Sequence, residues 1–114
     1  HRVHRRQRQM CIRDRLMDNI KGLDSSQKIM LKLSLPDQNN HYAPCIEHPN
    51  VIRVVALSGG YSMEEANARL SRNQGMTASF SRALTEGLSA GQSDSEFNQK
   101  LDSTIDSIFQ ASIT

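Results

Sequence analysis

The chain has 114 residues and a formal net charge of +2, from 14 Lys and Arg against 12 Asp and Glu, as expected for one small, mildly basic domain. Two cysteines provide neither a disulfide framework nor zinc-ligand spacing. No apolar run approaches the ~20 residues of a membrane span, and the N-terminal segment lacks the apolar core of a secretory signal. We therefore expect a cytoplasmic protein without a membrane partner.

The basic charge is concentrated in the first fifteen residues, HRVHRRQRQMCIRDR, whose six arginines and one acid give a net charge of +5. Residues 16–114 carry −3. Residues 1–15 show neither helical nor strand periodicity, and we consider a nucleic-acid-binding arm, a disordered leader, or non-native sequence. The stretch QMCIRDR resembles translated sequencing-adapter DNA. We favour this last origin, and so expect no nucleic-acid partner and a true protein that extends further upstream.

From residue 16 onward the pattern becomes regular. Leu16, Ile20 and Leu23 share one helical face. The apolar run 29–35, closed by Pro36, predicts a buried strand. Its period of two assigns alternate residues to opposite faces, with Met30, Lys32 and Ser34 on one face and Ile29, Leu31, Leu33 and Leu35 on the other.

The second half continues the alternation of helices and strands. A short helical piece over 41–47 precedes a β-branched strand over 51–57, and a further strand over 76–80 leads into a short helix from Ser81. Capping boxes over 62–65 and 93–96 predict two helix starts. We expect apolar stripes on both helices, formed by Met63, Ala66 and Leu70 on the first and by Phe97, Leu101, Ile105, Ile108 and Phe109 on the last.

Strands that alternate with helices indicate an α/β fold with a parallel sheet and crossover connections. Three parallel strands bury little surface, and an eight-stranded barrel of this kind needs about 250 residues. The pattern therefore indicates either a small three-stranded layer or part of a larger barrel.

Three features at predicted strand ends could carry chemistry. Lys32 is either a surface lysine on an edge strand or a nucleophile whose pKa is lowered by desolvation or by a neighbouring cation. The run Ser58-Gly59-Gly60 is either a tight turn or an anion-binding turn before a helix. Arg82, at the next helix start, could hold a phosphate through two N–H groups or form a surface ion pair.

Other candidate sites are weaker. His41 and His48 have no metal-ligating partners at a convincing spacing, and no Ser/His/Asp or Cys/His set is apparent. We expect Cys45 to be a small core residue.

Four ordered segments resemble class I fructose-bisphosphate aldolases, most closely the bacterial branch: IMLKLSLP, IEHPNVIRVVALSGGYSMEEAN, TASFSRAL and QSDSEFNQKLDSTIDSIFQAS. The resemblance covers residues 16–114. It implies the last three units of a (β/α)₈ TIM barrel, with strands six to eight and part of the preceding helix. The general acid and base, and a second charged lysine, would come from earlier strands that this chain lacks.

The resemblance also implies roles for individual residues. Lys32 aligns with the Schiff-base lysine, Ser58 and Gly59 with the phosphate-binding turn, and Arg82 with the phosphate-binding arginine. Ser81 stands where the animal enzymes have glycine, and the tyrosine-bearing tail of those enzymes has no counterpart. The implied reaction is reversible cleavage of fructose 1,6-bisphosphate in glycolysis or gluconeogenesis, without a metal or cofactor because an iminium ion acts as the electron sink.

Two alternatives remain open from the residues: a non-catalytic phosphate-binding module and a nucleic-acid-binding protein that uses its basic segment. We expect the 114 residues to be inactive on their own. The sequence leaves the oligomeric state open, a homo-oligomer included.

Overall fold

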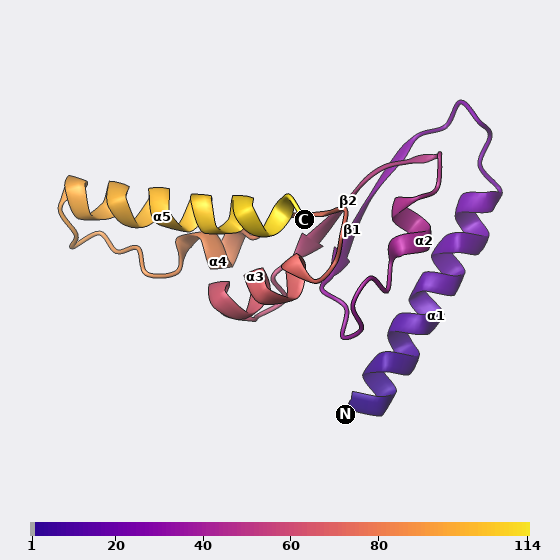
Figure 1. Ribbon diagram of the computed structural model, residues 1–114, viewed down its shortest axis with the longest axis horizontal. Coiled ribbons are helices and arrows are strands. Elements are labelled where there is room, and N and C mark those ends of the chain that lie inside the picture. Colours follow the sequence, from indigo (N-terminus) through magenta and orange to yellow (C-terminus); the bar gives the residue numbers. More distant parts are fainter. Residues whose placement is uncertain (1) are drawn as a thin grey trace.

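The computed structural model describes residues 2–114 of the chain, and side chains from His4 onward. Helices and strands alternate in the order predicted from the sequence (Figure 1): α1 Arg2–Lys21, β1 Ile29–Ser34, α2 Ala43–Ile46, β2 Val51–Leu57, α3 Met63–Ser71, β3 Met76–Ala78, α4 Ser81–Thr85 and α5 Asp94–Ser112. The fold is therefore mixed α/β.

The three strands form one parallel sheet in the order β1-β2-β3, as the sequence predicts. Lys32 pairs with Val55 and Ser34 with Leu57, after a register shift between Ile29 and Met30. Because parallel strands end at the same edge, the segments that follow β1, β2 and β3 start on one side of the molecule.

The alternation predicted for β1 is confirmed. Met30, Lys32 and Ser34 are exposed, whereas Leu31 and Leu33 are partly buried against the core. That core lies between the other face of the sheet and the helices, and its fully buried members include Val54, Ala56, Ala66, Leu70 and Met76. Cys45 is also fully buried, as expected.

The first helix is longer than the sequence pattern predicts. We expected it to begin near Leu16 and residues 1–15 to lack regular structure, but α1 runs without a break from Arg2 to Lys21. Arg, Gln and Met are good helix formers, so a helix here needs no apolar periodicity. His1 lies outside the described residues, and the origin of residues 1–15 stays a prediction.

The apolar stripe predicted for the last helix is only partly correct. Leu101 and Ile108 are partly buried, but Phe97, Ile105 and Phe109 are exposed. The reason is that α5 packs along one side only, against α3, α4 and β3. Its most buried positions are instead Thr104 and Ala111.

One of the two predicted capping boxes forms completely. At α5, Ser93 and Glu96 each accept a hydrogen bond from the other's backbone N–H. At α3, Ser62 Oγ accepts from the Glu65 N–H at 3.2 Å, but the box is not closed by a return bond to the Ser62 N–H. The Glu65 carboxylate instead accepts from Arg69 Nε at 2.9 Å.

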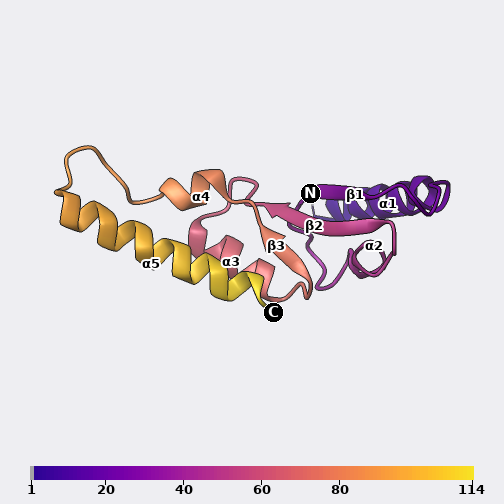
Figure 2. The ribbon, with the colours of Figure 1, turned by 90° about the horizontal axis from the view of Figure 1, so that it is seen from above.

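The molecule is elongated, with extents of 52 × 37 × 22 Å. Helices α4 and α5 form an arm beyond the β3 edge of the sheet, and α1 lies near its β1 edge (Figures 1 and 2). No described helix is long and apolar enough to cross a membrane.

Candidate functional site

The lysine on β1 lies on the open face of the sheet. The helices cover the opposite face, so Lys32 and its strand neighbours Met30 and Ser34 remain exposed. The described residues thus leave the Lys32 amine open to solvent at the edge strand of the sheet.

The turn after β2 is built by two glycines in the left-handed region. Gly59 has φ 62° and Gly60 φ 86°, values that side-chain-bearing residues rarely adopt. A Cβ placed on either glycine would meet nothing within 4 Å, so the space beside the backbone of this turn is open. Ser58 is buried just before the turn, and its carbonyl accepts from the Tyr61 N–H at 3.1 Å.

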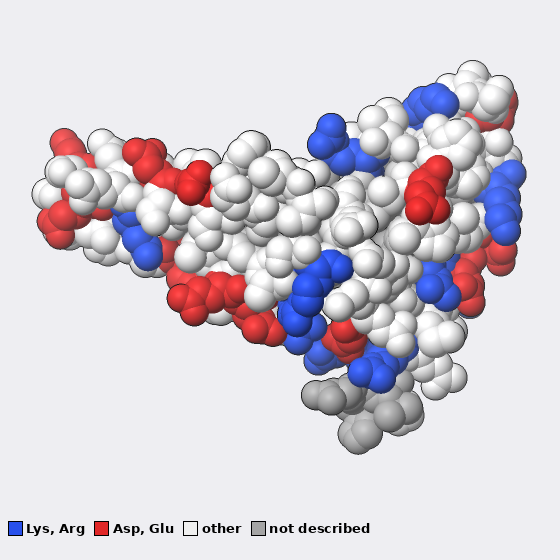
Figure 3. Space-filling model, viewed as in Figure 1, with Lys and Arg blue, Asp and Glu red and all other residues white. Residues whose placement is uncertain are grey.

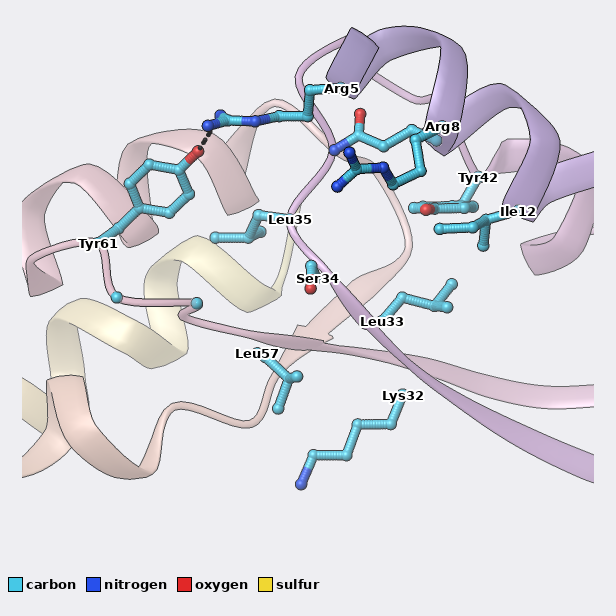
Figure 4. A pocket seen from close by; sticks show the side chains of 13 residues that line it. Arg5, Arg8, Ile12, Lys32, Leu33, Ser34, Leu35, Tyr42, Leu57 and Tyr61 are labelled. Carbon is cyan, nitrogen blue, oxygen red and sulfur yellow. Dashed lines mark hydrogen bonds between the residues drawn. The ribbon is translucent and has the colours of Figure 1, made fainter. Parts of the chain in front are cut away.

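A pocket of about 570 Å³ joins the lysine to this turn (Figure 4). Lys32, Gly59, Gly60 and Tyr61 line it from the two strand ends. Arg5 and Arg8 line it from α1 and lie on the side away from the Lys32 side chain, which extends toward Leu57. The Lys32 side chain therefore points away from the two arginines (Figure 4).

Tyr42 also lines this pocket and is 3% exposed. Burial, with a smaller contribution from Cys45 and an opposing one from Arg13, raises the pKa of the Tyr42 phenol above its ordinary value of 10.0. The phenol is therefore protonated at neutral pH and can donate a hydrogen bond.

A second pocket, of about 490 Å³, contains the predicted arginine. Arg82 lines it from α4, together with Ser62 and Glu86. Gly60 and Tyr61 line both pockets, so this short segment separates the lysine pocket from the arginine pocket.

The structure brings together some of the predicted site residues. Lys32 and Gly59 share one pocket, and Arg82 lies in the adjoining one. Ser58 supports the turn from beneath and Ser81 begins α4 as an exposed residue, so neither lines those two pockets.

Sequence reasoning missed the residues that other segments contribute. Arg5, Arg8 and Tyr42 reach the lysine pocket from positions that carry no local motif. Glu86, four residues after Arg82, accepts a hydrogen bond from the Met63 N–H at 2.7 Å. Its carboxylate therefore caps a free backbone N–H in the first turn of α3. Only Tyr61 had a usable signal, because it directly follows the glycine pair.

The part of the chain that the structure describes contains no group of three or more His, Cys, Asp or Glu side chains placed to hold a metal ion. Figure 3 shows acidic side chains gathered along the arm of α4 and α5, while most basic ones lie over α1 and near the sheet. An anionic ligand would therefore meet its most favourable charge near the sheet rather than along the arm.

A glycine turn at the carboxyl end of a parallel strand is a frequent place for phosphate binding in α/β folds. The chain matches no protein-family model. It is 56% identical to a class 1 fructose-bisphosphate aldolase of Synechocystis over 114 residues, all of this chain. It is 55% identical to that of Clostridium acetobutylicum over 96 residues, and 57% identical to that of Porphyromonas gingivalis over 88 residues.

The chain belongs to the class 1 fructose-bisphosphate aldolase family, as the sequence resemblance indicated. It spans 38%, 32% and 30% of the length of these three relatives, and thus about a third of the family's chain.

Proposed function

We propose that the chain is the catalytic-lysine portion of a class I fructose-bisphosphate aldolase. The observation that carries this is its identity of 55–57% to three relatives of that name, over 77–100% of the chain. The parallel sheet is compatible with strands six to eight of a (β/α)₈ barrel. The remaining strands would then cover the open sheet face on which Lys32 lies.

In this proposal, Lys32 is the nucleophile. Its neutral amine attacks the C2 ketone of fructose 1,6-bisphosphate, and loss of water gives an iminium ion. A general base takes the proton of the C4 hydroxyl as the C3–C4 bond breaks, the iminium accepts the electron pair of that bond, and glyceraldehyde 3-phosphate leaves. Protonation of the enamine and hydrolysis of the iminium then release dihydroxyacetone phosphate and regenerate the amine.

The phosphate groups position the ketose. The open backbone of Gly59, supported by Ser58, and the guanidinium of Arg82 are the proposed phosphate ligands, with Ser81 beside Arg82. Lys32 and Gly59 line a common pocket, which supports a ligand that touches both.

We further propose that these 114 residues do not turn over substrate by themselves. The described residues leave the Lys32 side chain exposed on the open face of the sheet. A general acid and base from other strands would also be needed.

A chimera tests this proposal. Residues 16–114 would replace the matching segment of the Synechocystis aldolase, and cleavage of fructose 1,6-bisphosphate would be measured. We expect activity close to that of the parent enzyme, and a loss of at least about a thousandfold in kcat/KM for Lys32→Arg.

Lys28→Arg is the matched control, because Lys28 lies four residues earlier and its ammonium donates to the Pro49 carbonyl at 3.1 Å. Arg82→Ala should raise KM by about tenfold, the size expected for a lost charge-assisted hydrogen bond. Full activity of the Lys32→Arg chimera, or turnover by the isolated chain near that of the intact enzyme, would contradict the proposal.

A further inference from the structure

One arginine of α3 contacts the loops that follow two different strands. Arg69 NH1 lies 3.5 Å from the Asp37 carboxylate, in the loop after β1. The Arg69 guanidinium carbon lies 4.3 Å from the centre of the Tyr61 ring, in the turn after β2. Its Nε donates to Glu65 at 2.9 Å within the same helix, which fixes the orientation of the guanidinium plane.

These contacts are more shielded than an ordinary surface ion pair. The Arg69 side chain is 23% exposed and that of Asp37 only 11%. Partial burial lowers the local dielectric and strengthens both the ion pair and the cation–π contact. The cluster of Arg69, Asp37 and Tyr61, hereafter the Arg69 cluster, therefore joins the two loops firmly.

The turn needs such a support because it has few restraints of its own. Gly59 and Gly60 have no side chains, and glycine gives the chain its greatest conformational freedom. Tyr61 is the first residue after them whose side chain can be held in place. It also lines both the lysine pocket and the arginine pocket.

We propose that Arg69 is a positioning residue that fixes the Gly59–Gly60 turn against the loop after β1. By holding Tyr61, it sets the spacing between the lysine pocket and the arginine pocket without touching the ligand. The contacts of Arg69 with both loops are the basis for its role in fixing the turn. The expected effect on phosphate affinity rests in addition on the proposed function.

Arg5 contacts the same two partners from α1. Its NH1 lies 3.4 Å from Asp37 and 3.3 Å from the Tyr61 hydroxyl. Arg5 is much more exposed than Arg69, with 54% of its side chain open to solvent. Because the Arg69 side chain is less exposed, at 23%, its contacts should support the turn more strongly than those of Arg5.

The test uses the 114-residue chain and follows the backbone amides by NMR. Hydrogen exchange is measured without ligand, and inorganic phosphate is then titrated. The variants are Arg69→Gln, Arg69→Lys and the control Arg72→Gln. Arg72 is exposed, lies at the end of the same helix and carries the same charge, so the control matches the change in net charge.

In Arg69→Gln we expect exchange at Tyr61, whose N–H donates to the Ser58 carbonyl, to rise about threefold to tenfold, the size expected for partly buried cation–π and ion-pair contacts. Exchange at the centre of α3 should stay unchanged, which separates a local role from general destabilisation. Phosphate affinity should fall by a similar factor. Arg69→Lys should recover part of both effects, and Arg72→Gln should change neither by more than about twofold.

Two results would overturn the inference: exchange at the turn in Arg69→Gln that matches Arg72→Gln, or an equal rise along the whole of α3. Absence of phosphate binding in the wild-type chain would contradict the proposed phosphate site instead. The exchange comparison would still decide the role of Arg69.

Discussion

Single residues fix where the segments between elements can lie. Gly75 has φ 85° and its N–H donates to the Thr114 carbonyl at 3.2 Å, which ties the start of β3 to the end of the chain. Asn50 likewise joins two segments, but through its side chain. Its buried amide donates to the Asp24 carbonyl at 2.8 Å and to the Gln27 carbonyl at 2.7 Å.

Gly75→Ala should destabilise the protein by about 1–3 kcal/mol, because the positive φ is strained for alanine and the new methyl must displace a neighbour. That neighbour is Ile46, whose Cγ2 lies 2.9 Å from the position of an added Cβ. Thermal unfolding measures the change.

Gly91→Ala is the control, since its nearest neighbour is the Ser89 hydroxyl at 4.0 Å. Equal stabilities of the two variants would contradict the argument.

Asn50→Ala should cost about 1–3 kcal/mol, because two carbonyls lose their donor in a partly buried site. Urea unfolding would report it. Asn98→Ala, at an exposed position of α5, should leave stability unchanged or slightly higher, since alanine is the better helix former. An Asn50→Ala variant as stable as wild type would show that water replaces the amide without loss.

At the scale of elements, the start of α5 is the best-defined helix terminus. The Ser93 side chain and then the Ser93 backbone, through their hydrogen bonds with Glu96, lower the pKa of the Glu96 carboxyl from 4.5. A carboxyl whose pKa is lowered on folding stabilises the fold above its unfolded pKa. That contribution is lost as the pH falls through the lowered value.

Ser93→Ala should therefore raise the pKa of Glu96 toward 4.5, as followed by an NMR titration of its side chain. The contribution of Glu96 to stability below pH 4.5 should then depend less on pH than in the wild-type chain. Ser95→Ala, in the same helical turn, serves as the control. An unchanged Glu96 titration in Ser93→Ala would contradict the capping account.

Elements with strong local signals could be predicted from the sequence. The β-branched run of β2 and the caps of α3 and α5 lie where expected, because turn and cap chemistry is local. Exposure of Phe97, Ile105 and Phe109 could not be predicted, because a stripe on a helix shows amphipathicity but not which neighbours are present. Helix α1 was missed over residues 2–15 because helix propensity, unlike periodicity, leaves no visible pattern.

In the candidate site, too, features with a local sequence signal could be predicted, and contacts between distant segments could not. That Lys32 and Gly59 line one pocket could be expected from the sequence, because both lie near the carboxyl ends of neighbouring parallel strands, which meet at one edge of the sheet. The part played by Arg69 depends on a contact with Asp37, 32 residues away, that no local motif records.

At the scale of the whole molecule, we propose that residues 1–15 are not needed for the remaining residues to fold, although the match to the Synechocystis aldolase covers all 114 residues. Their described apolar side chains include Met10 and Ile12, which are 44% and 41% exposed. Their polar contacts with the rest of the chain include those of Gln9 with Asp37 and His41. Most of the core is formed by later residues.

Deletion of residues 1–15 should therefore leave a chain that unfolds cooperatively, with a loss of no more than about 2 kcal/mol. Circular dichroism during thermal unfolding measures this, with Ile20→Ala in the intact chain as the comparison. Ile20 is 2% exposed, and its truncation should cost about 2–5 kcal/mol. A truncated chain without a cooperative transition would show that the segment is part of the domain.

The most direct test of the whole account is reductive trapping. The chain would be incubated with dihydroxyacetone phosphate at mildly alkaline pH, borohydride would reduce any iminium to a secondary amine, and peptide mass spectrometry would locate the adduct. The chain offers four lysines: Lys21, Lys28, Lys32 and Lys100. We predict that Lys32 carries most of the adduct and that inorganic phosphate competes with its formation. Equal labelling of all four lysines, or phosphate binding without an adduct on Lys32, would contradict its role as the Schiff-base nucleophile.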